Sequence, residues 1–160
     1  MRRMTLPLML FVVACQPATI ELTDAEKAAI ADTVNALQAE SWDAWRSADL
    51  DRALSYMHDS PDFWFALQGQ ALRGYDESDS FWRDGFGTAS RLDITISDSR
   101  TMVLAADIVA VFEQGAFSVT DAEGMTSPEQ PFVMSATWVR RHGEWGVLYG
   151  HESWPVPESM

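Results

Sequence analysis

The chain has 160 residues, of which 24 are Asp or Glu and 11 are Lys or Arg, so its net charge at pH 7 is −13. A surface this acidic repels phosphate backbones and anionic lipid headgroups, which argues against nucleic acid as a partner and against direct adsorption to a membrane. The single cysteine has no pairing partner for a disulfide, and seven Trp with eight Phe favour an aromatic interior, a lined pocket, or both.

The first fifteen residues have the layout of a secretory signal. Arg2 and Arg3 precede an apolar run that ends in Val12-Val13-Ala14-Cys15, and this run is too short to span a bilayer as a helix. Its last four residues resemble the bacterial lipobox, in which the cysteine is acylated and becomes the mature N-terminus. A buried free thiol, or an ordinary signal cleaved beyond Cys15, are the alternatives.

These features predict a domain organisation and a location. We expect a lipoprotein signal peptide in residues 1–14, a lipidated tether in residues 15–22, a folded domain in residues 23–154 and a short tail in residues 155–160. The protein would be a membrane-anchored lipoprotein of the bacterial cell envelope, facing the periplasm or the exterior. Its membrane contact would come only through the anchor at Cys15.

The first half of the folded domain is expected to be mainly helical. Thr23 and Glu26 have the spacing of a capping box, and an apolar stripe at helical spacing continues from there to about Ser47. Asp49 can cap a short second helix through Tyr56, and residues 76–86 indicate a third helix.

Strands and turns account for the rest. The predicted strands are residues 63–67, 71–73, 90–98, 101–117, 132–141 and 145–153. We expect turns at residues 97–99 and 142–143, and a loose loop over residues 119–131. Helices followed by consecutive strands indicate an α+β fold, in which a long N-terminal helix and two shorter helices pack on a curved antiparallel sheet.

Several motifs resemble the NTF2-like superfamily in their order and spacing. They are Arg46-Ser47-Ala48-Asp49-Leu50-Asp51, Leu72-Arg73-Gly74-Tyr75, the hairpin Trp138–Val147, and Tyr149-Gly150-His151-Glu152-Ser153. The last of these is similar to the ending of SnoaL-like and DUF4440-type members, and the likeness covers about residues 23–154.

The resemblance implies a cone-shaped domain, often dimeric through its sheet, with a pocket between sheet and helices. Relatives use this pocket for isomerisation, dehydration, hydrolysis, cyclisation or binding, so the fold does not decide the function. The catalytic aspartate and the oxyanion-hole tyrosine of steroid isomerases fall on Phe65 and Ser41 of this chain. An aromatic ring cannot abstract a proton, and a serine is a short and poor substitute for a phenol donor.

Alternation along the last strand predicts the catalytic candidates. Trp145 and Val147 are expected to face the core, so Tyr149 and His151 should point into the cone. His151 could then act as a general base beside the phenol of Tyr149, or simply be a hydrogen-bonded histidine at the rim. Glu152 has the opposite parity and is expected in solvent.

Aromatic side chains are the expected wall of the pocket. We assign Trp42, Phe65, Trp82 and Trp138 to this wall, together with Glu113, which shares the parity of apolar neighbours on its strand. His58 with Asp59 and Asp62 lacks a second histidine, so neither a metal nor another cofactor is expected.

Three functions stay open at this point. The first is a binding module that holds a small apolar or aromatic molecule in its cone. The second is a SnoaL-like enzyme of isomerase, cyclase or hydrolase type that uses His151 and Tyr149. The third is a dimerisation or docking module without a ligand. In each case we expect a homodimer.

Overall fold

The computed structural model describes residues 21–155. The predicted signal peptide, the lipidation residue Cys15 and most of the tail therefore lie outside the described residues. Within residues 21–155, no helix is both long enough and apolar enough to cross a bilayer.

The longest helix, α1 (Asp24–Arg46), begins at the predicted capping box. Glu26 N–H donates to Thr23 Oγ1 at 3.3 Å, and Thr23 N–H donates to the Glu26 carboxylate at 2.8 Å. These two bonds satisfy backbone donors that the first helical turn leaves free. The buried residues of α1 recur at intervals of three and four, so one stripe of the helix faces the sheet: Val34, Gln38, Ser41 and Ala44.

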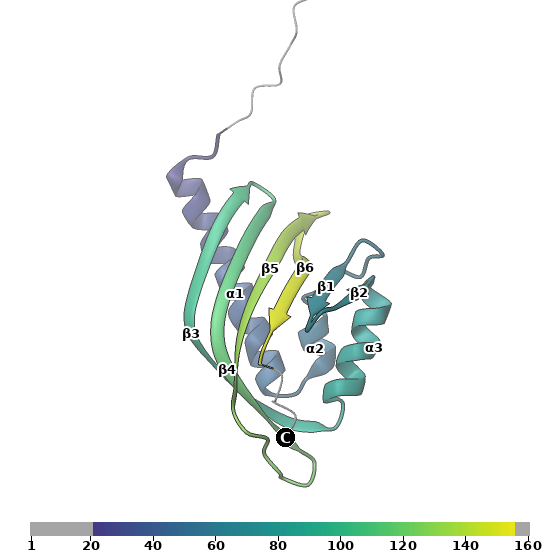
Figure 1. The fold of residues 1–160 in the computed structure, drawn as a ribbon. Helices are drawn as coiled ribbons and strands as arrows, with labels where there is room; N and C mark the ends of the chain where they lie inside the picture. The colour runs from purple at the N-terminus through teal and green to yellow at the C-terminus, as the bar shows by residue number, and fades with distance from the viewer. Residues whose placement is uncertain (1–20, 156–160) are drawn as a thin grey trace, which may run out of the picture.

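One six-stranded sheet forms the other layer, in the order β2-β1-β6-β5-β4-β3. The elements after α1 are α2 (Leu50–Leu54), β1 (Trp64–Leu67), β2 (Gln70–Arg73), α3 (Tyr75–Phe86), β3 (Ala89–Ala105), β4 (Ile108–Asp121), β5 (Gln130–Arg141) and β6 (Glu144–Ser153). Neighbouring strands are antiparallel except β1 and β6, which are parallel. In Figure 1 the sheet is curved and α1 runs behind it, with α3 beside β1 and β2. The α+β cone is confirmed.

The turn predicted at residues 97–99 is wrong. β3 continues through this point, and its register against β4 shifts between Ile96 and Asp98. The extra residue is absorbed as a β-bulge, where the Ser97 hydroxyl donates to the carbonyl of Gln114 at 3.1 Å. The hairpin turns instead at Ala106 and Asp107, between β3 and β4. Polar turn-forming residues alone could not separate a bulge from a turn.

A second bulge lies in β6 at Leu148. Trp138 pairs with Val147 and Thr137 pairs with Tyr149, so Leu148 has no partner on β5. On its other side β6 changes neighbour here: Val147 exchanges backbone bonds with Tyr56 and His58, whereas Tyr149 pairs with Trp64 of β1. The inserted residue reverses the alternation of side chains along the rest of the strand.

Candidate functional site

A cavity of about 80 Å³ lies between the helices and the inner face of the sheet. That volume holds several water molecules or one small ring. The cavity wall is mostly apolar and aromatic, with Gln38, Ser41 and Glu152 as its polar members. The other lining residues are Trp42, Trp45, Met57, Phe65, Trp82, Phe86, Leu92, Ile94, Phe117, Phe132, Met134, Ala136, Val147 and Trp154.

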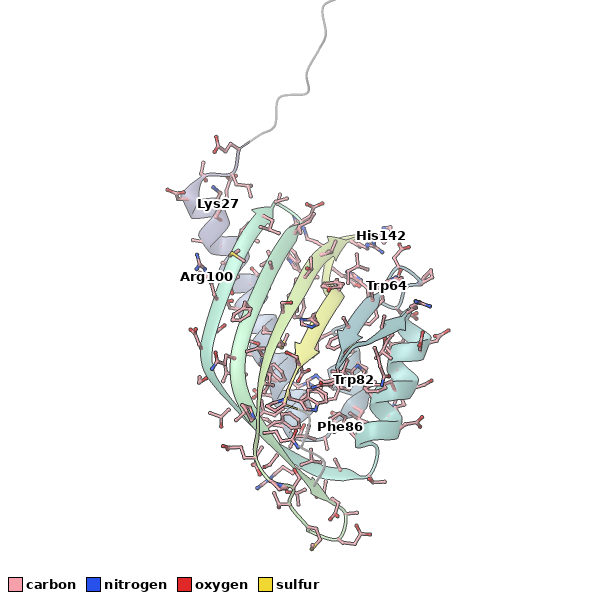
Figure 2. All side chains as sticks on the ribbon, in the orientation of Figure 1. Lys27, Trp64, Trp82, Phe86, Arg100 and His142 are labelled. Carbon is pink, nitrogen blue, oxygen red and sulfur yellow. The ribbon has the colours of Figure 1, made fainter. Side chains whose placement is uncertain are left out.

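Trp82 of α3 is the centre of the aromatic wall. Its ring lies 5.4 Å from Trp45, 5.2 Å from Phe65 and 5.8 Å from Phe86 between centroids. The contacts with Trp45 and Phe65 are edge-to-face and the contact with Phe86 is stacked. Aromatic pairs of this kind stabilise by about 0.5–1.5 kcal/mol each beyond the burial of apolar area. Figure 2 labels Trp82 and Phe86 on the side of the molecule where α3 lies. These contacts join α1, α3 and β1 into one rigid wall.

The Trp82 indole N–H is a buried donor with no hydrogen-bond partner in the described part of the chain. A buried donor without a partner costs about 1–3 kcal/mol. The aromatic packing around the ring therefore offsets a polar penalty in this wall.

Glu152 contributes a carboxylate to the cavity. Because of the bulge at Leu148, Glu152 lies on the inner face, opposite Met134 of β5. No other Asp or Glu, and no Lys, Arg or His, of residues 21–155 lines this cavity. Burial alone raises the pKa of Glu152 to about 7, from an ordinary value of 4.5. The side chain is thus divided between its neutral and charged forms at neutral pH.

A second carboxylate, Glu113, lies in the same row across the sheet. Glu113 of β4 pairs with Met134, which in turn pairs with Glu152. Glu113 accepts hydrogen bonds from Trp42 Nε1 at 2.7 Å and from Gln38 Nε2 at 3.0 Å. Ser99 Oγ donates a third bond, at 3.3 Å. Burial raises the pKa of Glu113, and these donors partly oppose the rise.

Glu113 lines a separate crevice between α1 and β3, together with Arg46 and Asn35. Gln38 and Trp42 line both spaces and separate Glu113 from the aromatic cavity. The role of Glu113 is therefore to hold these two side chains in the wall, rather than to meet a molecule inside it. Gln38 extends the network, because its Oε1 accepts from Trp138 Nε1 at 2.9 Å.

Some of the residues that the sequence assigned to the pocket line the cavity in the structure, and others do not. Trp42, Phe65 and Trp82 lie at the cavity, and so does Ser41. Trp138 is fully buried and does not line it, since it packs between α1 and the sheet with its N–H on Gln38. Glu113 belongs to the crevice.

The expectation that Tyr149 and His151 point into the cone is wrong. Tyr149 is 43% exposed and His151 is also exposed, whereas Val147, Gly150 and Glu152 face inward. The prediction assumed that side chains alternate strictly between the two faces after Val147. Leu148 is an extra residue in β6, so Tyr149 and His151 lie on the opposite face from the one predicted. The expectation of a solvated Glu152 fails for the same reason.

A sequence signal for this reversal existed at Gly150. A Cβ atom on Gly150 would overlap the ring of Phe65, so the strand can pass this aromatic wall only where it carries glycine. A glycine inside a strand often marks a bulge or a close approach. It could have warned that alternation does not continue to Glu152.

His58 is also accounted for by the fold. Its Nε2 lies 2.8 Å from the carbonyl of Val139, and its ring packs against Gly146. Within residues 21–155 no cluster of three His, Cys, Asp or Glu side chains could hold a metal ion.

Comparison with known proteins identifies the family. The family model described as SnoaL-like domain matches residues 34–157, most of the chain. The chain belongs to the SnoaL-like domain family, within the NTF2-like superfamily. No curated protein matches it.

Solved structures share the fold at low sequence identity. An NTF2-like superfamily protein from Salmonella enterica is 17% identical with a TM-score of 0.66, over 87% of this chain and 97% of that one. A ketosteroid isomerase-like protein from Erwinia carotovora is 18% identical with a TM-score of 0.64, over 79% and 97%. The association domain of CaMKII from C. elegans is 20% identical with a TM-score of 0.62, over 82% and 99%. At these identities the likeness concerns the fold alone.

Glu152 makes the stability of the domain depend on pH. Its raised pKa means that the native state holds a proton more tightly than the unfolded chain does. Stability should therefore fall as pH rises from about 4.5 to about 7. We expect Glu152→Gln, which imitates the neutral acid, to match the wild type at pH 4 and to be more stable by about 1–3 kcal/mol at pH 8.

Urea denaturation at both pH values measures this difference. Glu144→Gln removes an exposed carboxylate from the first residue of the same strand and is the matched control. An equal effect of the two substitutions at pH 8 would contradict the burial of Glu152.

Proposed function

We propose that this protein binds a small apolar or aromatic molecule in the cavity under its sheet. The observation that carries the proposal is an aromatic-walled cavity with one unpartnered carboxylate. Small-molecule sites are typically concave, mostly apolar, and equipped with a few polar groups that orient the ligand. The catalytic alternative built on His151 and Tyr149 loses its basis, because neither side chain reaches the cavity.

The binding proposal also fits the way the wall is held. Glu113, Gln38 and Trp138 form a hydrogen-bonded chain that fixes one side, and the ring contacts of Trp82 fix the other. A pocket that is already formed loses little conformational entropy when a ligand enters.

Toluene is a suitable first probe, because its size is close to that of the cavity. We expect binding with a Kd of about 1 mM or below, with NMR shifts at the methyl groups of Leu92 and Ile94. Ala136→Leu should abolish these shifts, since Ala136 lines the cavity and a larger side chain fills it.

Ala116→Leu makes the same change on β4 at a position that alternates with the inward-facing Gly115 and Phe117, and it should leave binding intact. If the wild type does not respond to toluene, or if Ala136→Leu binds as well as the control, the cavity is not the binding site.

We also propose that the domain is anchored to the cell envelope through acylated Cys15. The support is the sequence Val12-Val13-Ala14-Cys15 behind two arginines and an apolar run. Mass spectrometry of the protein extracted from bacterial membranes should show a diacylglycerol on Cys15. Cys15→Ser should remove the lipid and leave the signal uncleaved, and an unmodified Cys15 in the wild type would refute the anchor.

The outer face of the sheet is proposed to bind a second copy of the chain. Trp64, Phe112 and Tyr149 each expose more than two fifths of their surface on this face. Trp64 and Tyr149 pair directly across β1 and β6, so their side chains form one apolar patch. One structural relative is named as an association domain, which is consistent with assembly.

Sedimentation equilibrium should show a dimer of the wild type and a shift to monomer for Phe112→Arg. Met125→Arg places the same charge on an exposed methionine in the loop between β4 and β5, and it should remain dimeric. A monomeric wild type at tens of micromolar would refute the interface.

A further inference from the structure

The Glu152 carboxylate lies in a cavity with aromatic walls, and no positively charged side chain of residues 21–155 lines that cavity. The other lining groups from α1, α3 and the neighbouring strands are neutral within residues 21–155. Two titratable neighbours in the sheet face elsewhere: Glu113 faces the crevice behind Gln38 and Trp42, and His151 faces solvent. Glu152 is half-buried, and a carboxylate that loses contact with water is stabilised by either a proton or a cation close to it.

The aromatic rings of the cavity wall can attract a cation in addition to the Glu152 carboxylate. Eight aromatic side chains line the cavity: Trp42, Trp45, Phe65, Trp82, Phe86, Phe117, Phe132 and Trp154. The face of an aromatic ring carries negative partial charge and attracts ammonium groups, with Trp the strongest. Four of these eight rings are indoles. The net charge of −13 also raises the local concentration of cations around the domain.

On the basis of the binding function proposed above, we propose that the ligand is an organic cation. Its ammonium group lies against the Glu152 carboxylate, and its ring or alkyl body lies among the aromatic side chains. A neutral hydrocarbon would leave Glu152 without a partner, so it is expected to bind more weakly than a cation of the same shape.

The competing possibility is a carbonyl compound that accepts a hydrogen bond from protonated Glu152. The two ligand classes require opposite protonation states of the same group. Cation binding needs the carboxylate, so affinity rises with pH, whereas carbonyl binding needs the acid, so affinity falls with pH. With a pKa of about 7, the ionised fraction changes by about tenfold between pH 6 and pH 8.

Benzylammonium and ethylbenzene are suitable probes, because they are nearly the same in shape, only slightly larger than toluene, and differ in one charge. We expect calorimetry at pH 8 to show at least tenfold tighter binding of the cation. Between pH 8 and pH 6 the affinity for the cation should fall about tenfold while that for the hydrocarbon does not fall. Acetophenone serves as the carbonyl probe over the same pH range.

Glu152→Gln should remove the preference for the cation and its pH dependence, while ethylbenzene still binds. Glu144→Gln is the matched control and should behave as the wild type. The pH profile of the wild type tests the same idea even if the substituted protein folds poorly.

The outcomes separate this inference from the function on which it rests. If ethylbenzene binds as tightly as the cation, or if acetophenone alone gains affinity at pH 6, the organic-cation inference fails and the binding function stands. If none of the three probes binds but toluene does, the organic-cation inference alone fails. If toluene does not bind either, both fail.

Discussion

At Leu148 the last strand carries one residue more than β5 opposite it, because β6 changes its other neighbour at that point. Before the bulge, Val147 is bonded to the segment that follows α2, and after it Tyr149 pairs with β1. The two neighbours require different positions along the strand, and the inserted residue absorbs the difference. As a result Glu152 faces the cavity, while Tyr149 and His151 face outward. The chemistry of the interior depends on this single insertion.

The two carboxylates on the inner face of the sheet have different roles because their surroundings differ. Glu113 and Glu152 both pair with Met134, so they lie in one row across the sheet, on the two strands that flank β5. Glu113 accepts bonds from three side chains and serves to position Gln38 and Trp42. Glu152 has only apolar burial acting on it, which raises its pKa to about 7. A carboxylate whose hydrogen-bonding capacity is filled by neighbouring side chains has a structural role. A carboxylate in a cavity without such partners is available to a ligand.

Because one fold can support many functions, the proposed binding function rests on the cavity and not on the likeness to other structures. Phe65 and Ser41, which the sequence comparison places at the positions of the steroid isomerase aspartate and tyrosine, both lie at the cavity wall. Their side chains supply an apolar ring and a short hydroxyl where an acid and a phenol would be needed for isomerisation. Among the polar side chains of the cavity wall within residues 21–155, Glu152 is the one that can carry a charge.

The sequence by itself determined the helical half, the capping box at Thr23, the α+β order and the aromatic wall at Trp42, Phe65 and Trp82. These depend on local spacing, on caps and on the need to bury rings, which are all visible in a linear chain. Tertiary structure alone decided the bulges at Ser97 and Leu148, and with them the face on which Glu152 lies. A bulge arises where a strand must satisfy two neighbours at once, and those neighbours are distant in sequence, so alternation within one strand could not reveal it.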